Sequence, residues 1–483
     1  MAGLFGISVD SYKYGGRFLD ELFLGMFYHQ HLGRRGGFVY FENDKAKKQT
    51  FKGAVGPDSV GSFDKTDSQT GIAYYGDADE PFYFESMLGN IAVCFTGNIT
   101  NIDELRLEIK RDGGIFERKS DIEVIAEFIV RWSRKKENTQ RQKIISGIKA
   151  FNKKAKGAYS LLILSKEKIY AVCGPTGHWP LIIGRKNGAV VIASESGGFG
   201  NLGFEIFKEL KPGEIISIKN AQMRRAGVLP KRDARICGFL WAYTAFPTST
   251  FKGVSASIVR RRLGAFLAED DIGKKFFPHL VIAVPDSGRF HGFGYFHEFW
   301  RQTKLGQIDP GKLPLPDEPM VKYTSVRSFL QNRKNRDAAA YFKILNTGDY
   351  LDYFIELLRT SDSREVLKQI EKEQGCITIV VLEDSVVRGT QLKENFGPKL
   401  RRIFAPLRVE IHVRSSYPSI ESHCIHGKTT QRGEILAVNV PDKEARIRKL
   451  KVDGLEYNSR EAFVQAIGIP CDQICMDCTF PAK

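Results

Sequence analysis

The residues with the clearest chemical potential lie in the stretch ITIVVLEDSVVRGTQL, at positions 377–392. An apolar run of strand length ends in two adjacent acids, Glu383 and Asp384, and a turn that contains Gly389 follows. A parallel sheet binds ligands outside the carboxyl ends of its strands, and a glycine-containing loop at a helix N-terminus presents backbone amides to a phosphate. Acids just before such a loop can hold ribose hydroxyls or Mg²⁺. The pattern therefore predicts a phosphate site with a sugar or a metal ion beside it.

Cysteine is the second residue type whose placement could carry chemistry. The chain has 8 cysteines, which are too few for its length to form a disulfide scaffold. Cys475 and Cys478 form a CxxC pair, whereas Cys237 and Cys424 lie far upstream. A CxxC turn suits two thiolates on one metal ion or cluster. The spacing alone leaves open whether the four thiols share a metal site or are unrelated.

Two different successions of strands and helices must position these residues. The first half shows short apolar strands broken by Gly and Asn, with helical stretches at 16–31 and 120–134, a pattern that predicts stacked antiparallel sheets with helices outside. After the polar, Pro-containing segment 228–237, the strands HLVIAVP and CITIVVLED each lead through a Gly-containing loop into a helix. That succession is typical of a parallel α/β sheet. We therefore expect two domains, at 1–235 and 236–483.

Composition and charge limit the class of protein. The chain has 42% hydrophobic and 27% charged residues, values that are ordinary for a globular enzyme. No apolar run approaches the roughly 18 residues of a membrane span, and no signal-peptide pattern is visible, so a cytoplasmic location without a membrane partner is expected. The net charge of +16 fits nucleic acid, a polyphosphate substrate or a solvated basic surface. No recognisable DNA- or RNA-reading motif occurs, so no nucleic-acid partner is expected.

The stretch at 377–392 resembles the phosphoribosyl-pyrophosphate (PRPP) signature of type I phosphoribosyltransferases, in the form found in the glutamine PRPP amidotransferase (amidophosphoribosyltransferase) family. That family shows two Asp residues followed by Ser-Ile-Val-Arg-Gly-Thr-Thr, from which Glu383 and Gln391 depart here. VIAVPDSGRFHGFGYF is similar to the family's pyrophosphate loop. KYTSVRSFLQ and RDAAAYFKILN are similar to two further segments, the second being a flexible loop that folds over PRPP and that keeps Lys343.

This resemblance implies a set of ligand-binding residues. The implied PRPP-binding residues are Asp286, Ser287, Gly288, Lys343, Glu383, Asp384, Ser385, Val386, Val387, Arg388, Gly389 and Thr390. Mg²⁺ is expected on Ser287, Glu383 and Asp384. The iron–sulfur branch of the family has cysteines at four matching places, so a [4Fe–4S] cluster, with zinc as the second choice, is expected on Cys237, Cys424, Cys475 and Cys478.

The N-terminal half resembles a class II glutamine amidotransferase domain whose catalytic parts are missing. In such domains the residue after the initiator Met is a Cys nucleophile, with its own α-amino group as the base, but here it is Ala2. The oxyanion-hole Asn is replaced by Thr96, and GIAYYGDAD at 71–79 lacks the Arg that clamps the glutamine carboxylate. Gly97 and Asp121 remain. A hydrolase without its nucleophile cannot form the thioester, so a pseudo-glutaminase with a retained fold is expected.

Together these resemblances imply a two-domain fold of the α/β and α+β classes. An N-terminal αββα sandwich, like that of N-terminal-nucleophile hydrolases, precedes a parallel-sheet domain of the type I phosphoribosyltransferases. The implied function is transfer of the phosphoribosyl group of PRPP to ammonia, free or supplied by a partner protein, giving 5-phosphoribosylamine or a related product in purine-type nucleotide biosynthesis. Transfer to a different amine and non-catalytic sensing of PRPP or a nucleotide are the alternatives. A homo-oligomer is expected.

Overall fold

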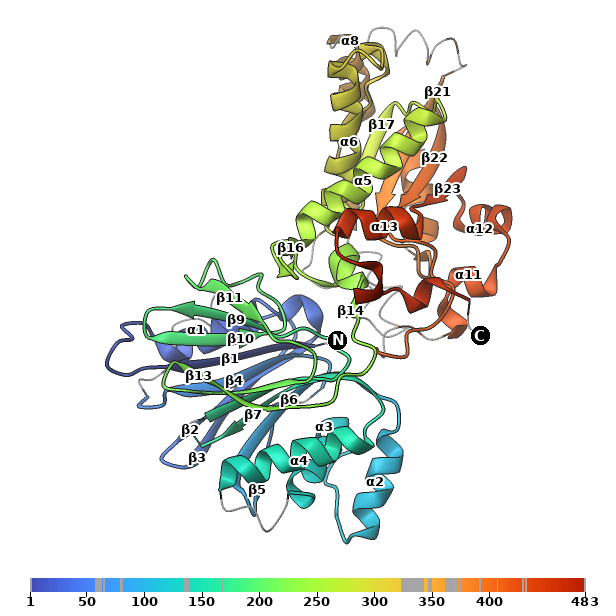
Figure 1. Cartoon of the computed structure of the whole chain (residues 1–483). Helices are drawn as coiled ribbons and strands as arrows, with labels where there is room; N and C mark the ends of the chain where they lie inside the picture. The colour runs from blue at the N-terminus through green and yellow to red at the C-terminus, as the bar shows by residue number, and fades with distance from the viewer. Residues whose placement is uncertain are drawn as a thin grey trace.

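The chain folds into two parts that lie end to end, the N-terminal part below and the C-terminal part above in Figure 1. The computed structural model describes residues 2–56, 63, 66–78, 81–133, 139–166, 168–322, 343–345, 350–360, 370, 372, 375–390, 392–405, 407–427, 430 and 432–481. None of the helices in these ranges combines the length and the hydropathy that a bilayer crossing needs.

Two antiparallel sheets form the N-terminal part. The first has the order β11-β9-β10-β1-β4-β2-β3, and the second has the order β13-β12-β8-β7-β6-β5. The strands of the first are β1 (Gly3–Val9), β2 (Arg35–Glu42), β3 (Lys45–Lys52), β4 (Thr70–Gly76), β9 (Ile182–Lys186), β10 (Ala189–Ala193) and β11 (Glu205–Glu209). Those of the second are β5 (Phe82–Ser86), β6 (Gly89–Ile99), β7 (Gly157–Ser165), β8 (Lys168–Cys173), β12 (Glu214–Lys219) and β13 (Gln222–Val228). One buried cluster joins their facing sides and includes Leu4, Ile72, Leu162 and Ile183.

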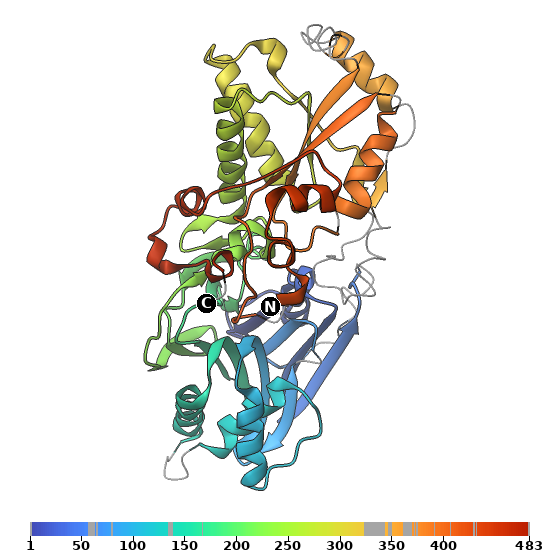
Figure 2. The same cartoon turned by 90° about the vertical axis from the view of Figure 1, so that its right-hand side faces the viewer.

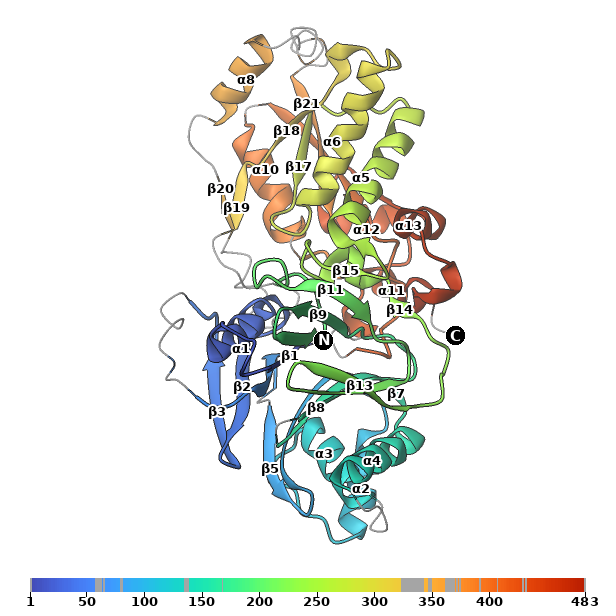
Figure 3. The same ribbon diagram turned by 60° about the vertical axis from the view of Figure 1, so that its left-hand side comes forward.

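Helices cover the outer side of each sheet, which completes the αββα layers (Figure 3). Helix α1 (Phe18–Phe27) packs on β1, β2 and β4, while α2 (Ile102–Arg111), α3 (Asp121–Arg131) and α4 (Gln140–Lys154) cover the second sheet. The predicted helical stretches are confirmed as α1 and α3 with shorter bounds. Helix α2 was not predicted, because charged residues dominate its composition, although Leu105 and Ile109 lie on one buried face.

The second part is built on a parallel sheet with the order β18-β17-β21-β22-β23, which confirms the predicted sheet type. Its strands are β17 (Leu280–Ala283), β18 (Leu315–Asp317), β21 (Cys376–Glu383), β22 (Arg408–Ser415) and β23 (Gly454–Tyr457). Along β21, Val380 and Leu382 pack against α5 (Ala256–Gly273) and α6 (Arg289–Lys304). Ile379 and Val381 face the other side, where α8 (Tyr350–Thr360), α10 (Gly397–Ile403) and α12 (Lys443–Leu450) lie. Burial on both sides explains why this strand is almost wholly apolar.

Short elements connect the two parts. Strand β14 (Ile236–Cys237) pairs in parallel with β24 (Ile474–Cys475), so the C-terminal segment, red in Figure 2, returns to the junction. A hairpin of β15 (Thr250–Phe251) and β16 (Val254–Ser255), the π-helix η3 (Leu240–Thr244), α11 (Leu436–Asn439) and α13 (Arg460–Ile467) complete it. The predicted boundary after residue 235 falls between β13 and β14 and stays a prediction, since one apolar cluster runs from Phe5 to Phe463 across it.

Candidate functional site

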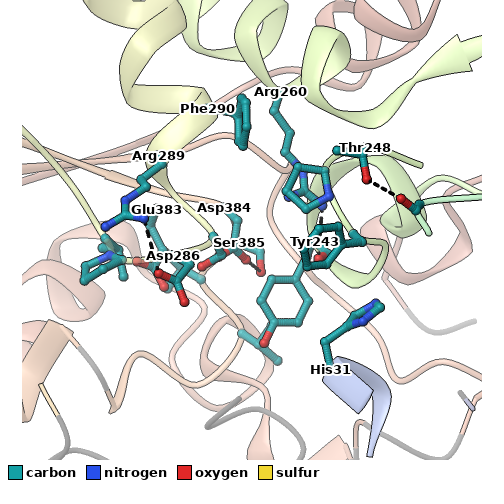
Figure 4. A pocket seen from close by; sticks show the side chains of 18 of the residues that line it. His31, Tyr243, Thr248, Arg260, Asp286, Arg289, Phe290, Glu383, Asp384 and Ser385 are labelled. Carbon is teal, nitrogen blue, oxygen red and sulfur yellow. Dashed lines mark hydrogen bonds and ion pairs between the residues drawn. The ribbon is translucent and has the colours of Figure 1, made fainter. Parts of the chain in front are cut away.

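A cavity of about 680 Å³ lies where the two parts of the chain meet, at the carboxyl ends of β17 and β21. The loops 284–287 and 383–390 line it from the C-terminal part, and Tyr28, Gln30 and His31 line it from the N-terminal part. Figure 4 shows Asp286, Glu383, Asp384 and Ser385 on one side and His31 and Tyr243 on the other. The structure thus brings together two loops that the sequence separates by about a hundred residues, and their ligand-binding roles stay predictions.

Hydrogen bonds to the neighbouring strand end fix the acid pair. The carbonyl oxygen of Glu383 accepts the N–H of Ser416 at 2.9 Å, and that of Asp384 accepts the N–H of Tyr417 at 2.9 Å. The Ser385 hydroxyl donates to Asp384 Oδ1 at 2.8 Å. Asp384 is only 2% exposed, so its carboxylate lies deep in the cavity wall.

The loop after the acid pair is anchored through its carbonyl oxygens and one side chain. The carbonyl oxygen of Val387 accepts the N–H of Leu436 at 2.8 Å. Gly389 has φ +73°, and a Cβ at this position would lie 2.2 Å from Leu450 Cδ2, so both backbone conformation and packing require glycine. The Arg388 guanidinium donates from Nε to Glu434 Oε2 at 2.9 Å. Sequence reasoning missed this partner, which stands in the segment QRGEILA.

The loop that resembles the family's pyrophosphate loop has two residues that line the cavity and one glycine that serves packing. Asp286 and Ser287 line the cavity. Gly288 precedes α6, its N–H donates to the carbonyl oxygen of Val284 at 2.8 Å, and a Cβ there would lie 2.5 Å from the carbonyl oxygen of Leu382. The Gly288 amide is therefore engaged inside the loop, and the glycine lets the loop approach β21.

Arg289 adds a cation to this loop, and sequence reasoning did not single it out although it follows directly on the motif. Its Nη1 lies 3.6 Å from Asp286 Oδ1, and its Nε donates to Glu318 Oε1 at 2.6 Å. The hydrogen bond to the Glu318 carboxylate raises the pKa of the guanidinium. Arg289 therefore stays charged at the edge of the cavity.

The closing loop that the sequence predicts lies mostly outside the described residues. Of its residues, Lys343 belongs to strand β20 (Lys343–Leu345), which pairs antiparallel with β19 (Met320–Lys322) and sets Lys343 opposite Lys322. The side chain of Lys343 is not among those described, so its contact with a ligand stays a prediction.

The buried carboxylate of Glu195 binds residues in the N-terminal wall of the cavity. It lies 3.2 Å from His31 Nε2 and accepts the N–H of Phe246 at 2.9 Å and the hydroxyl of Ser249 at 3.1 Å. Burial alone would raise the pKa of Glu195, but His31, His29 and the Phe246 N–H lower it to about 2. No sequence motif points to this residue, because its partners come from both parts of the chain.

Ala2, which stands where the family resemblance expects a nucleophile, is buried. The Ala2 N–H donates to Thr96 Oγ1 at 2.9 Å, and a Cβ on Gly76 would lie 2.1 Å from the Tyr74 hydroxyl and 2.8 Å from Ala2 Cβ. Gly97 has φ +128°, and a Cβ there would lie 2.1 Å from a carbonyl oxygen of β7. Gly97 therefore serves strand packing, while Ala2 and Thr96 contact one another.

The four predicted cysteines meet at the junction of the two parts. Strand pairing sets Cys237 opposite Cys475, and burial together with the neighbouring thiols raises the pKa of Cys237 well above its ordinary value. Burial likewise raises the pKa of Cys475 and of Cys478 to about 12, and it raises the pKa of Cys424. Thiols crowded in this way become thiolates only beside a cation.

Among the described residues, these four thiols do not gather as closely as the ligands of one metal ion. Within the described part of the chain, no three cysteine Sγ atoms all lie within 4.8 Å of one another. Ligands of one tetrahedral ion lie closer together, whereas an iron–sulfur cluster holds its thiolates apart on several irons. Two histidines that the sequence did not single out, His178 and His426, lie against Cys475.

Comparisons with known proteins agree with this architecture. A family model described as a glutamine amidotransferase domain matches residues 72–200. The amidophosphoribosyltransferase of Methanocaldococcus jannaschii is 30% identical over 99% of this chain and 96% of that protein. That of Bacillus subtilis is 26% identical over 89% of this chain and 78% of that protein.

A solved structure confirms the predicted fold. Glutamine PRPP amidotransferase from B. subtilis, complexed with ADP and GMP, superposes with a TM-score of 0.76 at 24% identity. The match covers 99% of this chain and 96% of that chain. The predicted N-terminal sandwich followed by a phosphoribosyltransferase-type domain is therefore correct.

Proposed function

The chain belongs to the amidophosphoribosyltransferase family, and from this membership we propose that it transfers the phosphoribosyl group of PRPP to ammonia without a glutaminase of its own. The product is 5-phosphoribosylamine or a related compound of purine-type nucleotide biosynthesis, and pyrophosphate leaves. The observation that supports the proposal most is the single cavity that unites the acid pair, the phosphate loop and the pyrophosphate loop.

The cavity supplies positioning and charge, which this reaction needs most. A C–N bond forms at C1 of the ribose while the C–O bond to pyrophosphate breaks, through an oxocarbenium-like state that gains little from an acid or base on the protein. Because its carbonyl oxygens hold the loop 386–390 in place, its amides and the Thr390 hydroxyl are suited to the 5-phosphate. Asp286 and Arg289 stand where the pyrophosphate would leave.

Two metal cofactors belong to the proposal. Mg²⁺ would be held by Ser287, Glu383 and Asp384 and would neutralise the leaving pyrophosphate. A [4Fe–4S] cluster, with zinc as the second choice, fits the buried thiols of Cys237, Cys424, Cys475 and Cys478 and would fasten the C-terminal segment to the junction.

Ammonia has to come from solution or from a partner protein, because the glutaminase parts are lost. Ala2 has no nucleophile, Thr96 occupies the oxyanion position and binds the Ala2 backbone, and no Arg stands at 71–79. The proposal includes a cytoplasmic location and a homo-oligomer.

One assay tests the proposal directly. Pyrophosphate release from PRPP is measured with ammonia at high pH, with glutamine, and with a panel of other amines. We expect release with ammonia and none with glutamine. If only another amine supports release, that amine and not ammonia is the acceptor. Tight PRPP binding without any release would make the chain a sensor. Absence of PRPP binding would overturn the proposal.

A further inference from the structure

Three segments that are distant in the sequence bring two imidazoles to the thiol of Cys475. His178 lies between β8 and β9, His426 lies in the segment after β22, and Cys475 ends β24. One ligand atom from each side chain lies within 4.8 Å of the other two, and the two imidazole ring centroids are 4.3 Å apart. Three donors this close together are spaced as the ligands of one metal ion are.

His178 has an unused, buried ring nitrogen. The residue is only 2% exposed, and among the described residues its Nε2 is buried without a hydrogen-bond partner. Its ring donates to the backbone carbonyl of Arg235, which assigns the proton to Nδ1. Nε2 therefore carries a lone pair inside the protein.

His426 lies beside a carboxylate through one ring nitrogen and leaves the other ring nitrogen over. Its Nε2 lies 3.8 Å from Asp477 Oδ2, and this carboxylate is held in place by Arg235 through hydrogen bonds of 2.6 and 3.1 Å. Its Nδ1 is buried and has no hydrogen-bond partner among the residues that the structure describes. A histidine anchored to a carboxylate or a carbonyl through one nitrogen, with the other nitrogen left over, is typical of metal ligands.

We propose that His178, His426 and Cys475 form a mononuclear site for a divalent transition-metal ion of the zinc class. Imidazole and thiolate donors suit zinc and exclude the hard cations Mg²⁺ and Ca²⁺, which prefer oxygen. Three protein ligands leave a fourth position open for water or another ligand. Binding releases the Cys475 thiol proton to solvent, since the thiolate is the ligand.

This site competes with the proposed four-cysteine cluster for one ligand. Cys475 cannot serve both at once, so the ion binds in chains that carry no iron–sulfur cluster. The bound ion would connect the N-terminal part through His178 to the segment of His426 and to the C-terminal strand β24. A bound metal would therefore hold the two parts of the chain together both with and without the iron–sulfur cluster.

Cobalt(II) is the probe, because its visible absorption reports both coordination number and thiolate ligation. The full chain, prepared iron-free with a chelator that is then removed, is titrated with Co²⁺ under reducing conditions. We expect one tightly bound ion per chain, bands typical of tetrahedral coordination with a single thiolate, and displacement of the bands by one equivalent of Zn²⁺. His178→Ala and His426→Ala should each weaken binding about 100-fold or more, since losing a ligand exceeds the 10–100-fold cost of losing an outer partner.

Matched variants separate this site from its neighbours. His423→Ala, at an exposed histidine three residues before His426, should leave the titration unchanged, as should Cys471→Ser at an exposed cysteine. Cys424→Ser removes a proposed cluster ligand, so it should abolish the cluster and keep the Co²⁺ bands. Circular dichroism tests whether each variant is folded. If His178→Ala does not fold, His178→Gln takes its place.

Two results would overturn the inference. One is a folded, iron-free chain that binds no Co²⁺. The other is a spectrum with several thiolate ligands that survives in both histidine variants, because the four cysteines would then hold the ion. Neither result depends on PRPP binding or on pyrophosphate release, so the proposed transferase function is tested separately.

Discussion

Replacing Glu195 by Gln should destabilise the fold at neutral pH and leave it unchanged in strong acid. The carboxylate accepts hydrogen bonds from Phe246 and Ser249 and lies beside His31, so it joins the N-terminal wall of the cavity to the segment after η3. Glu195→Gln keeps the size of the side chain and removes its charge. The change therefore tests the electrostatic contribution and not the packing.

The expected magnitude follows from the pKa. His31, His29 and the Phe246 N–H overcome burial and lower the pKa of Glu195 from 4.5 to about 2. At about 1.4 kcal/mol for each pH unit, this difference corresponds to roughly 3 kcal/mol of unfolding free energy. Because the folded-state pKa lies below the unfolded one, this stability is fully present above about pH 4.5 and is lost as the pH falls to 2. The two proteins should therefore have equal stability below pH 2.

Urea unfolding at a series of pH values measures the difference. At pH 7 Glu195→Gln should unfold at lower urea concentration, and in a thermal scan its Tm should fall by roughly 6–12 °C. The control is Glu205→Gln, at an exposed glutamate of β11, which should change neither value. Equal stability at pH 7, or a deficit that persists unchanged below pH 2, would refute the electrostatic reasoning.

Four further changes test the sites. Asp384→Asn should weaken Mg²⁺-dependent PRPP binding more than tenfold in calorimetry, because a ligand charge is lost while shape is kept, and an unchanged titration would contradict this role. Glu434→Gln should weaken the same binding a few-fold, because Arg388 loses the carboxylate that orients it. Ala2→Cys should yield neither glutamate from glutamine nor labelling by glutamine-analogue electrophiles, since the oxyanion donor and the clamp would still be absent. Protein purified without oxygen should be brown with about four irons per chain, and Cys478→Ser should be colourless.

Local patterns in the sequence were enough to predict the strands of both parts and the loop after β21. An apolar strand, two acids and Gly389 are neighbours in the chain, so a ligand-binding loop can be predicted from them without knowledge of the fold. The sequence placed Gly389 in this loop, and the structure adds that its hydrogen makes room for Leu450. Contacts across the junction could not be predicted in this way. His178 and Cys475 are almost three hundred positions apart, and only folding brings their ligand atoms together.

The proposed absence of glutaminase chemistry does not make the N-terminal part dispensable. Tyr28, Gln30 and His31 line the cavity in which PRPP is proposed to react, so without them the acid pair would face solvent. An open site would favour water over ammonia as the acceptor at C1, because water is far more concentrated. Removing the wall would expose the reaction to hydrolysis. We infer that this shielding is a role that the sandwich keeps although Ala2 supplies no nucleophile.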